Sequence, residues 1–227
     1  MRKKSLSFLV VVALTGIFLA AGCVRRTAPR SKPPVASDAA ISAVAFLGKT
    51  FAVAPFTIPS SDADLLSGYL PSKHIVPETA LPRLDTILQE SLANSNQHFA
   101  PSGMVASCAK TASRGNESGR LAARRYWQNV GKCAGADYIL VPLALNWQER
   151  DGSDIGATNP ASVDISIYLL DVRTGGIVRH FHYEETQQPL SENLLNAKKF
   201  FARHGRFLTA SELSQEALAQ CVREFGL

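Results

Sequence analysis

Hydrophobic and polar positions divide the chain into strands and helices. Residues 50–56 form a short apolar run that ends in Pro-Phe, which is typical of a buried strand. Residues 136–148 and 162–172 alternate apolar positions over a longer span. Residues 177–185 follow the second of these after Thr174-Gly175-Gly176, a turn sequence that predicts an antiparallel hairpin.

Helical spacing of apolar residues marks four further segments. Residues 82–94, 120–132 and 191–203 each place apolar side chains on one stripe. The final helix begins at a capping box, with Thr209 as N-cap and Glu212 three residues later. We expect this C-terminal helix to pack its apolar stripe on the sheet.

Two segments between these elements have weaker patterns. Residues 98–108 predict a second strand, and residues 110–119 predict a polar loop. Residues 57–77 are rich in proline and serine and form a connection of unusual length, so the segment is either functional or disordered.

The order of elements predicts an α/β (α+β) fold. Strand, helix, strand, helix, three strands and two helices follow one another, which gives the order βαβαβββαα. Helical crossovers allow the first three strands to pair in parallel, and the last two add antiparallel. We therefore expect a mixed sheet of about five strands with helices packed on it.

The N-terminus carries a secretory signal pattern. A basic cluster at residues 2–4 precedes the uncharged, mostly apolar residues 6–20, and small residues lead to a cysteine. The stretch Leu19-Ala20-Ala21-Gly22-Cys23 resembles the lipobox of bacterial lipoproteins, although Ala20 stands where leucine is usual. This resemblance implies lipidation of the Cys23 thiol and cleavage before it. The alternative is an uncleaved transmembrane helix, which needs about 20 apolar residues.

These patterns predict a division of the chain into three parts and a cellular location. Residues 1–22 are the signal peptide, residues 23–40 are the lipidated cysteine with a flexible tether, and residues 41–227 are a single domain. We expect the domain to be attached to a membrane of the bacterial cell envelope through its lipid. Val24, rather than aspartate, favours the outer membrane, with the domain facing the periplasm.

Charge argues against nucleic acid as a partner. Three of the 24 basic residues lie in the predicted signal peptide, so 21 remain against 19 acidic residues. A protein that binds nucleic acid usually carries a pronounced basic excess. The mature chain is nearly neutral, and an export signal points to a different compartment.

Cysteines suit an oxidising compartment. After lipidation of Cys23 three remain, and Cys108 with Cys133 is the favoured disulfide because the two residues end neighbouring predicted elements. Cys221 would then be a free thiol. The alternative is three buried thiols that act as small hydrophobic side chains.

Three short stretches carry a family resemblance: the strand ending in Pro55-Phe56, residues 135–141 and residues 170–176. Over residues 51–185 the pattern resembles the domain of the CsgG and LpoB lipoproteins, which is similar to the N-terminal domain of TolB. The resemblance implies a lipid-tethered adaptor that binds another envelope protein or assembles with copies of itself. A CsgG-type pore needs two long amphipathic hairpins, and residues 146–162 leave no room for one.

Candidate chemistry is sparse. The sequence holds no nucleophile elbow, zinc-protease motif or phosphate-binding loop, so we expect no enzyme and no cofactor. His180, His182 and Glu184 alternate on one predicted strand, so their side chains share a face and form a candidate set for zinc or copper. The alternative is a solvated polar face.

A basic and aromatic segment precedes the last helix. It could contact lipid headgroups, anionic glycan or an acidic partner, or it could be an amphipathic helix with its charges in water. Trp127 and Trp147 are expected in the core or at its rim. The segment comprises Lys198, Lys199, Phe200, Phe201, Arg203, His204, Arg206 and Phe207.

Together these features predict an accessory or adaptor protein of envelope assembly that acts by protein–protein binding. The alternative is a lipoprotein module that binds a small ligand, a metal or a glycan.

Overall fold

The structure is a computed structural model that describes residues 46–227, except 73, 114–117 and 189–196. The predicted signal peptide, Cys23 and the tether over residues 23–40 lie outside the described residues. Within the described ranges, every helix is too short or too polar to cross a membrane.

A five-stranded mixed sheet forms the centre of the domain, in the strand order β2-β1-β3-β6-β7. The strands are β1 (Thr50–Val53), β2 (His98–Phe99), β3 (Tyr138–Gln148), β6 (Ser162–Asp171) and β7 (Ile177–Thr186). Strand β1 pairs in parallel with β2 and β3, whereas β3, β6 and β7 are antiparallel. The predicted fold class, a mixed sheet with helices packed on it, is confirmed.

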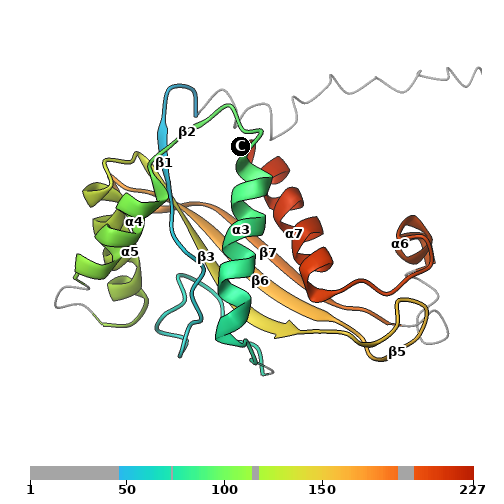
Figure 1. Ribbon diagram of the computed structural model, residues 1–227. Coiled ribbons are helices and arrows are strands. Elements are labelled where there is room, and N and C mark those ends of the chain that lie inside the picture. The colour runs from blue at the N-terminus through green and yellow to red at the C-terminus, as the bar shows by residue number, and fades with distance from the viewer. Residues whose placement is uncertain (1–45, 73, 114–117, 189–196) are drawn as a thin grey trace, which may run out of the picture. The chain divides into compact units, whose positions relative to one another are not determined.

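Helices cover both faces of the sheet (Figure 1). Helices α3 (Leu81–Leu92) and α7 (Ala210–Phe225) pack on one face, and α4 (Ser102–Thr111) and α5 (Gly119–Cys133) pack on the other. The smaller elements are the 3-10 helix η1 (Glu78–Ala80), the two-stranded ribbon of β4 (Asp151–Gly152) and β5 (Ala157–Asn159), and helix α6 (Ala197–Ala202).

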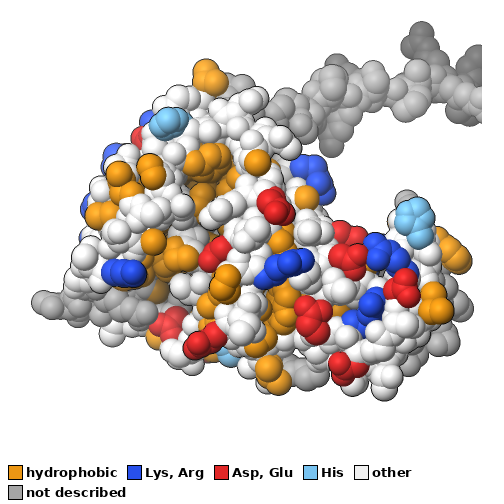
Figure 2. Space-filling view, in the orientation of Figure 1, with side chains coloured by type: hydrophobic (Ala, Val, Ile, Leu, Met, Phe, Trp, Pro, Cys, Tyr) orange, Lys and Arg blue, Asp and Glu red, His pale blue; other side chains and the backbone are white. Residues whose placement is uncertain are grey.

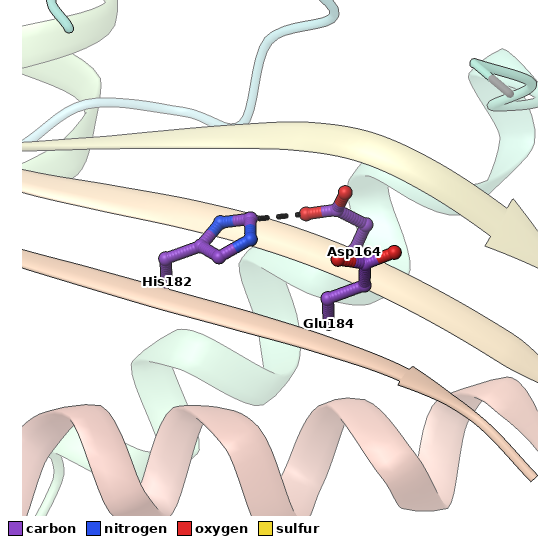
Figure 3. A group of neighbouring side chains, drawn as sticks. All are labelled: Asp164, His182 and Glu184. Carbon is purple, nitrogen blue, oxygen red and sulfur yellow. Dashed lines mark ion pairs between the residues drawn. The ribbon is translucent and has the colours of Figure 1, made fainter. Parts of the chain in front are cut away.

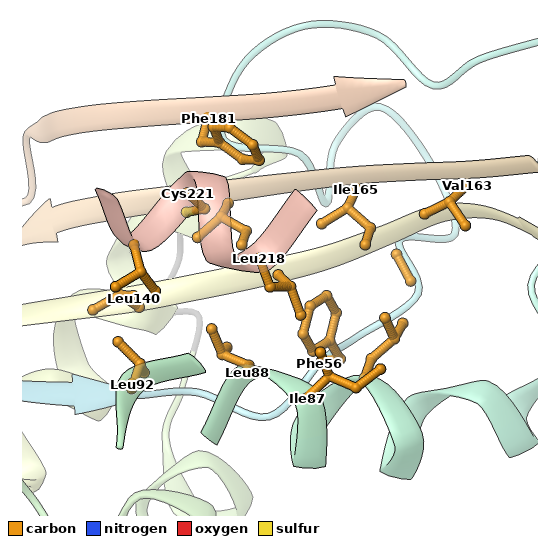
Figure 4. Close-up of a cluster of buried hydrophobic side chains, with 14 of the residues drawn as sticks. Phe56, Ile87, Leu88, Leu92, Leu140, Val163, Ile165, Phe181, Leu218 and Cys221 are labelled. Carbon is orange, nitrogen blue, oxygen red and sulfur yellow. The ribbon is translucent and has the colours of Figure 1, made fainter. Parts of the chain in front are cut away.

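Successive side chains of β6 point to opposite faces of the sheet, so they pack against different helices. Val163 and Ile165 face α3 and α7, where they pack with Leu88 and Leu218 (Figure 4). Tyr168 and Leu170, at alternate positions of the same strand, pack in the core cluster on the α5 side. Because each buried leucine or isoleucine contributes about 1.5–3 kcal/mol, this two-sided burial supplies much of the driving force for folding.

The predicted strand over residues 98–108 is wrong beyond its first two residues. Strand β2 ends at Phe99, and Pro101 is the N-cap of helix α4 with a φ of −55°. Proline is favourable at such a start because its φ is already restricted and it needs no backbone donor. Val105 and Cys108 are buried three residues apart, which is helical spacing.

The last helix begins as predicted. The Thr209 hydroxyl accepts a hydrogen bond from the Glu212 backbone N–H at 3.2 Å, and the Glu212 carboxylate accepts one from the Thr209 N–H at 2.8 Å. Gly226 ends the helix with a φ of 71°, a conformation that favours glycine. At α5, in contrast, Ser118 stands at the N-cap but its side chain makes no cap hydrogen bond.

Candidate functional site

The segment over residues 57–77 is packed against the sheet, although the sequence left open whether it is disordered. Leu65 and Leu66 are buried with the α5-side core. The Tyr168 hydroxyl donates to the Ser67 carbonyl at 2.8 Å. Nε2 of His74 lies 2.9 Å from the Pro59 carbonyl oxygen, and Nδ1 contacts the carbonyl of Leu145. This loop therefore covers part of the sheet next to α5, whose Arg124 donates to the Leu66 carbonyl at 3.1 Å.

A row of polar side chains runs along β6 and β7 on the same face as this loop. Antiparallel pairing sets Asp164 opposite Glu184 and Ser166 opposite His182. Directly paired residues project to the same side of a sheet. His180, two residues before His182, therefore shares the face as well.

Three of these side chains converge. The ligand atoms of Asp164, His182 and Glu184 all lie within 4.8 Å of one another (Figure 3). Nδ1 of His182 lies 3.6 Å from Oδ1 of Asp164. The Asp164 side chain is only 5% exposed, whereas that of His182 is 44% exposed. In this group Asp164 is therefore buried, whereas His182 faces solvent.

The Asp164 carboxylate is poorly satisfied. Its Oδ1 atom is buried and has no hydrogen-bond partner among the described residues. Burial raises the pKa of Asp164 to about 6, while His182 opposes the rise, Glu184 adds to it and His74 opposes it. Asn146, paired opposite Asp164 on β3, uses its amide nitrogen to bind the Ser162 hydroxyl instead.

His180 makes different contacts from the two other residues of the predicted metal set. Its Nε2 lies 2.7 Å from the Ser166 hydroxyl oxygen, and its ring stacks on Tyr168 with centroids 4.3 Å apart. Burial and the neighbouring His182 lower the pKa of His180. Ser166 is 2% exposed, so this serine–histidine pair satisfies a buried hydroxyl and offers no accessible nucleophile.

Sequence reasoning missed Asp164, although it placed His182 and Glu184 on one face. The available signal was one acidic residue between the apolar positions Val163 and Leu170 of β6. A buried carboxylate is rarely retained without a partner, so an acid at that position merits attention.

The basic and aromatic segment holds a second polar cluster. Arg203 donates to Glu185 at 2.6 and 3.2 Å, and it also binds Glu216. Lys199 and the Tyr183 hydroxyl complete the contacts of Glu185. Burial alone would raise the pKa of Glu185, but these hydrogen bonds outweigh it and lower the pKa to about 2.

The remaining residues of that segment are divided between core and surface. Phe207 is buried, Phe201 is exposed, and Arg206 pairs with Glu212 at 2.8 Å. Figure 2 shows charged side chains of both signs gathered over this part of the molecule. Ion pairing within the chain thus engages much of the positive charge. The side chains of Lys198 and Phe200 lie outside the described residues.

The predicted cysteine pair lies on two helices rather than on a strand and a helix. Cys108 of α4 and Cys133 at the end of α5 are joined by a disulfide, with their Cα atoms 5.7 Å apart. Cys221 of α7 is a free thiol inside the core, and burial raises its pKa. Trp127 and Trp147 are also buried.

A cavity of about 640 Å³ opens between α3 and α4, where β1 and β2 end. Its lining includes Leu88, Phe99 and Ala106, and Figure 2 shows apolar side chains gathered in this region. Asp85 is the acidic group of the lining, and it accepts a hydrogen bond from the Phe56 N–H at 2.7 Å. The carboxyl ends of parallel strands are a common place for ligand sites.

Comparisons with known proteins give a similar fold at low identity. No family model and no curated protein matches the chain. It is similar in structure to the PelC dodecamer from Paraburkholderia phytofirmans, with a TM-score of 0.41 and 12% identity over 78% of this chain and 86% of that one. It is also similar to lipoprotein GNA1162 from Neisseria meningitidis, with a TM-score of 0.41 and 12% identity over 68% and 96% of the two chains.

The C-terminal domain of LpoB from Salmonella enterica is a further structural relative, with a TM-score of 0.34 and 17% identity over 62% of this chain and 84% of that one. At these identities and TM-scores, the likenesses carry no argument about what this chain does.

Proposed function

We propose that this chain is a lipid-anchored accessory protein of the bacterial envelope that works by binding another envelope protein, without catalysis. The observation that carries the proposal is the signal-like N-terminus that ends at Cys23. Several acyl chains would hold the domain firmly to a membrane, because each buried methylene contributes about 0.8 kcal/mol. The tether over residues 23–40 would leave the domain free to meet a partner in the periplasm.

The absence of a catalytic motif in the sequence supports a binding role. In the serine–histidine pair, His180 is exposed but the Ser166 hydroxyl is buried, so the pair gives an enzyme hypothesis little support. Binding of a protein partner through a surface requires no set of catalytic residues.

A surface suited to a protein partner lies where the loop meets α5. Tyr69 is 80% exposed, and Leu121 is exposed beside Arg120. The Arg120 guanidinium lies 5.1 Å from the centroid of the Tyr69 ring. Tyrosine and arginine are enriched among the residues that dominate binding energy at protein interfaces.

Replacing Cys23 by serine tests the anchor. The variant should lose labelling by radioactive palmitate and should accumulate as the uncleaved precursor. Cys221→Ser is the matched control because its thiol is buried in α7, and it should be labelled like the wild type. An unlabelled wild type that stays in the membrane fraction would instead indicate an uncleaved helix.

Photo-crosslinking tests the partner. A photoreactive residue placed at Tyr69 or at Leu121 of the intact lipoprotein should trap the same envelope protein in living cells. The same residue at Gln215, exposed on α7, is the control and should trap nothing reproducible. If the two surface positions behave like Gln215, this surface does not bind a partner.

The cavity between α3 and α4 favours a second candidate function, the binding of a small apolar molecule. Its volume falls within the roughly 300–1,000 Å³ typical of ligand pockets. The dye 1-anilinonaphthalene-8-sulfonate, given to the native protein, should fluoresce in the cavity. Ala106→Phe should abolish that signal, whereas an unchanged signal would argue against the pocket.

A further inference from the structure

We propose that Asp164, His182 and Glu184 form a binding site for one divalent transition-metal ion of the zinc class. The site goes beyond the proposed envelope role and does not depend on it, because residues of β6 and β7 alone form it.

The donor set matches the ion. Two carboxylates and one imidazole offer the oxygen and nitrogen ligands that Zn²⁺ accepts, and together they carry the charge that a divalent cation neutralises. Mg²⁺, in contrast, prefers oxygen ligands and usually keeps several waters. The histidine therefore favours zinc over magnesium.

Distances in the group are close to those of a coordinated ion. Ligands at about 2.1 Å from a tetrahedral zinc lie roughly 3.4 Å from each other. Nδ1 of His182 and Oδ1 of Asp164 are 3.6 Å apart, which is long for a hydrogen bond and suits two ligands of one ion. Glu184 is exposed and within 4.8 Å of both, so a rotation of its side chain brings it into place.

An unsatisfied buried atom points to the ligand. Oδ1 of Asp164, within the part of the chain that the structure describes, is buried without a hydrogen-bond donor. Glu185 of β7, the other largely buried acid at this end of the β6–β7 pair, is bound by Arg203, Lys199 and Tyr183. The protein supplies donors to one buried carboxylate and leaves the other facing a histidine and a second carboxylate. A metal ion is the partner that satisfies this arrangement.

The site is built on a rigid frame and remains open. Asp164 and Glu184 are cross-strand neighbours in a regular antiparallel pairing, so their backbones are held in register. Like charges placed directly opposite each other destabilise a sheet, and a bound cation reverses the sign of that interaction. The exposed rim at His182 gives the ion a path from solvent and leaves a coordination position for water or another donor.

Titration of the purified, detergent-solubilised lipoprotein tests the site. The protein is stripped with EDTA, exchanged into metal-free buffer and titrated with ZnCl₂ or with MgCl₂, using calorimetry and elemental analysis. We expect one Zn²⁺ per chain, no saturable Mg²⁺ uptake, and a higher Tm with zinc. Asp164→Asn and His182→Ala should each weaken zinc binding at least tenfold.

Two further variants keep the test decisive. Glu184→Gln alters an exposed side chain, so its folding is not at risk, and it too should weaken binding. His98→Ala removes an exposed imidazole on β2, at the other edge of the sheet, and should bind zinc like the wild type. The proposal is overturned if the wild type binds no zinc, if Glu184→Gln binds it unchanged, or if His98→Ala loses it equally.

Discussion

Replacing Arg203 by methionine should lower the free energy of unfolding by about 3–5 kcal/mol at pH 7. Methionine keeps much of the length of the side chain and removes its charge. Arg203 is largely buried and binds Glu185 and Glu216 at once, so the substitution strips a buried carboxylate of its main partner. Breaking a buried pair from one side is costly because the remaining charge stays out of water.

The pKa of Glu185 gives an independent magnitude. It lies at about 2 in the folded protein against an ordinary value of 4.5, and the side chain is only 14% exposed. The difference corresponds to about 3 kcal/mol of stability. Because the folded pKa is depressed, this contribution is present above pH 4.5 and is lost as the pH falls towards 2.

Urea denaturation followed by circular dichroism, at several pH values between 2 and 7, measures both effects. Glu185→Gln should remove the part of the acid dependence that this group supplies. Arg223→Met is the control because Arg223 is exposed on α7, and its effect should stay within about 0.5 kcal/mol. An Arg203→Met protein as stable as that control, with unchanged acid dependence, would refute the reasoning.

Two other predictions concern cross-links and packing. Reducing the disulfide between α4 and α5, which closes a separation of 25 residues, should lower stability by about 3.5 kcal/mol. Among the three cysteines of the described residues, Ellman titration in urea should count one thiol before reduction, Cys221, and three after it, and a Cys23 that carries the proposed lipid adds none. Gly131→Ala should destabilise the protein by about 1–3 kcal/mol because the new methyl group would collide with Val172. Gly103→Ala in α4 is the control, since its methyl group meets open space, and it should be neutral or slightly stabilising. Thermal melting measures both variants, and equal effects would show that contact with Val172 is not the cause.

Local signals explain the elements that were predicted well. The capping box at Thr209 and Glu212 and the glycine at 226 act within one helix, so the sequence predicts both ends of α7. Strand β2 is different. Its two residues pair with β1 across a separation of almost 50 positions, and such a short edge strand has no period of its own. The proline at 101 was the sign that a helix follows.

Long-range packing explains what the sequence could not show at the candidate site. Alternation places His182 and Glu184 on one face, but only the pairing of β6 with β7 brings Asp164 to them. The loop over residues 57–77 adds His74 from a distant part of the chain. The partners of Arg203 are likewise 13 and 18 residues away, on other elements. The spacing of residues along one strand therefore predicts neither the Asp164 group nor the ion pairs of Arg203.

Asp164 and Glu185 lie at the same end of the β6–β7 ribbon, and both are largely buried, yet their pKa values move in opposite directions. Partners decide the difference, because Glu185 is held by an arginine, a lysine and a tyrosine, whereas Asp164 faces a histidine and another acid. Without metal, the raised pKa of Asp164 means that this group's own contribution to stability is fully present below pH 3.8 and falls by about 3 kcal/mol as the pH rises through 6.

Asp164→Asn should therefore stabilise the EDTA-treated protein at pH 7 by up to about 3 kcal/mol, measured by urea denaturation. Glu185→Gln should destabilise it under the same conditions. If the two substitutions change the free energy of unfolding in opposite directions, then the partners of each carboxylate, rather than its burial, determine its contribution to stability. A destabilised Asp164→Asn protein would mean that the carboxylate has a favourable partner even without metal, and that its buried oxygen is already satisfied.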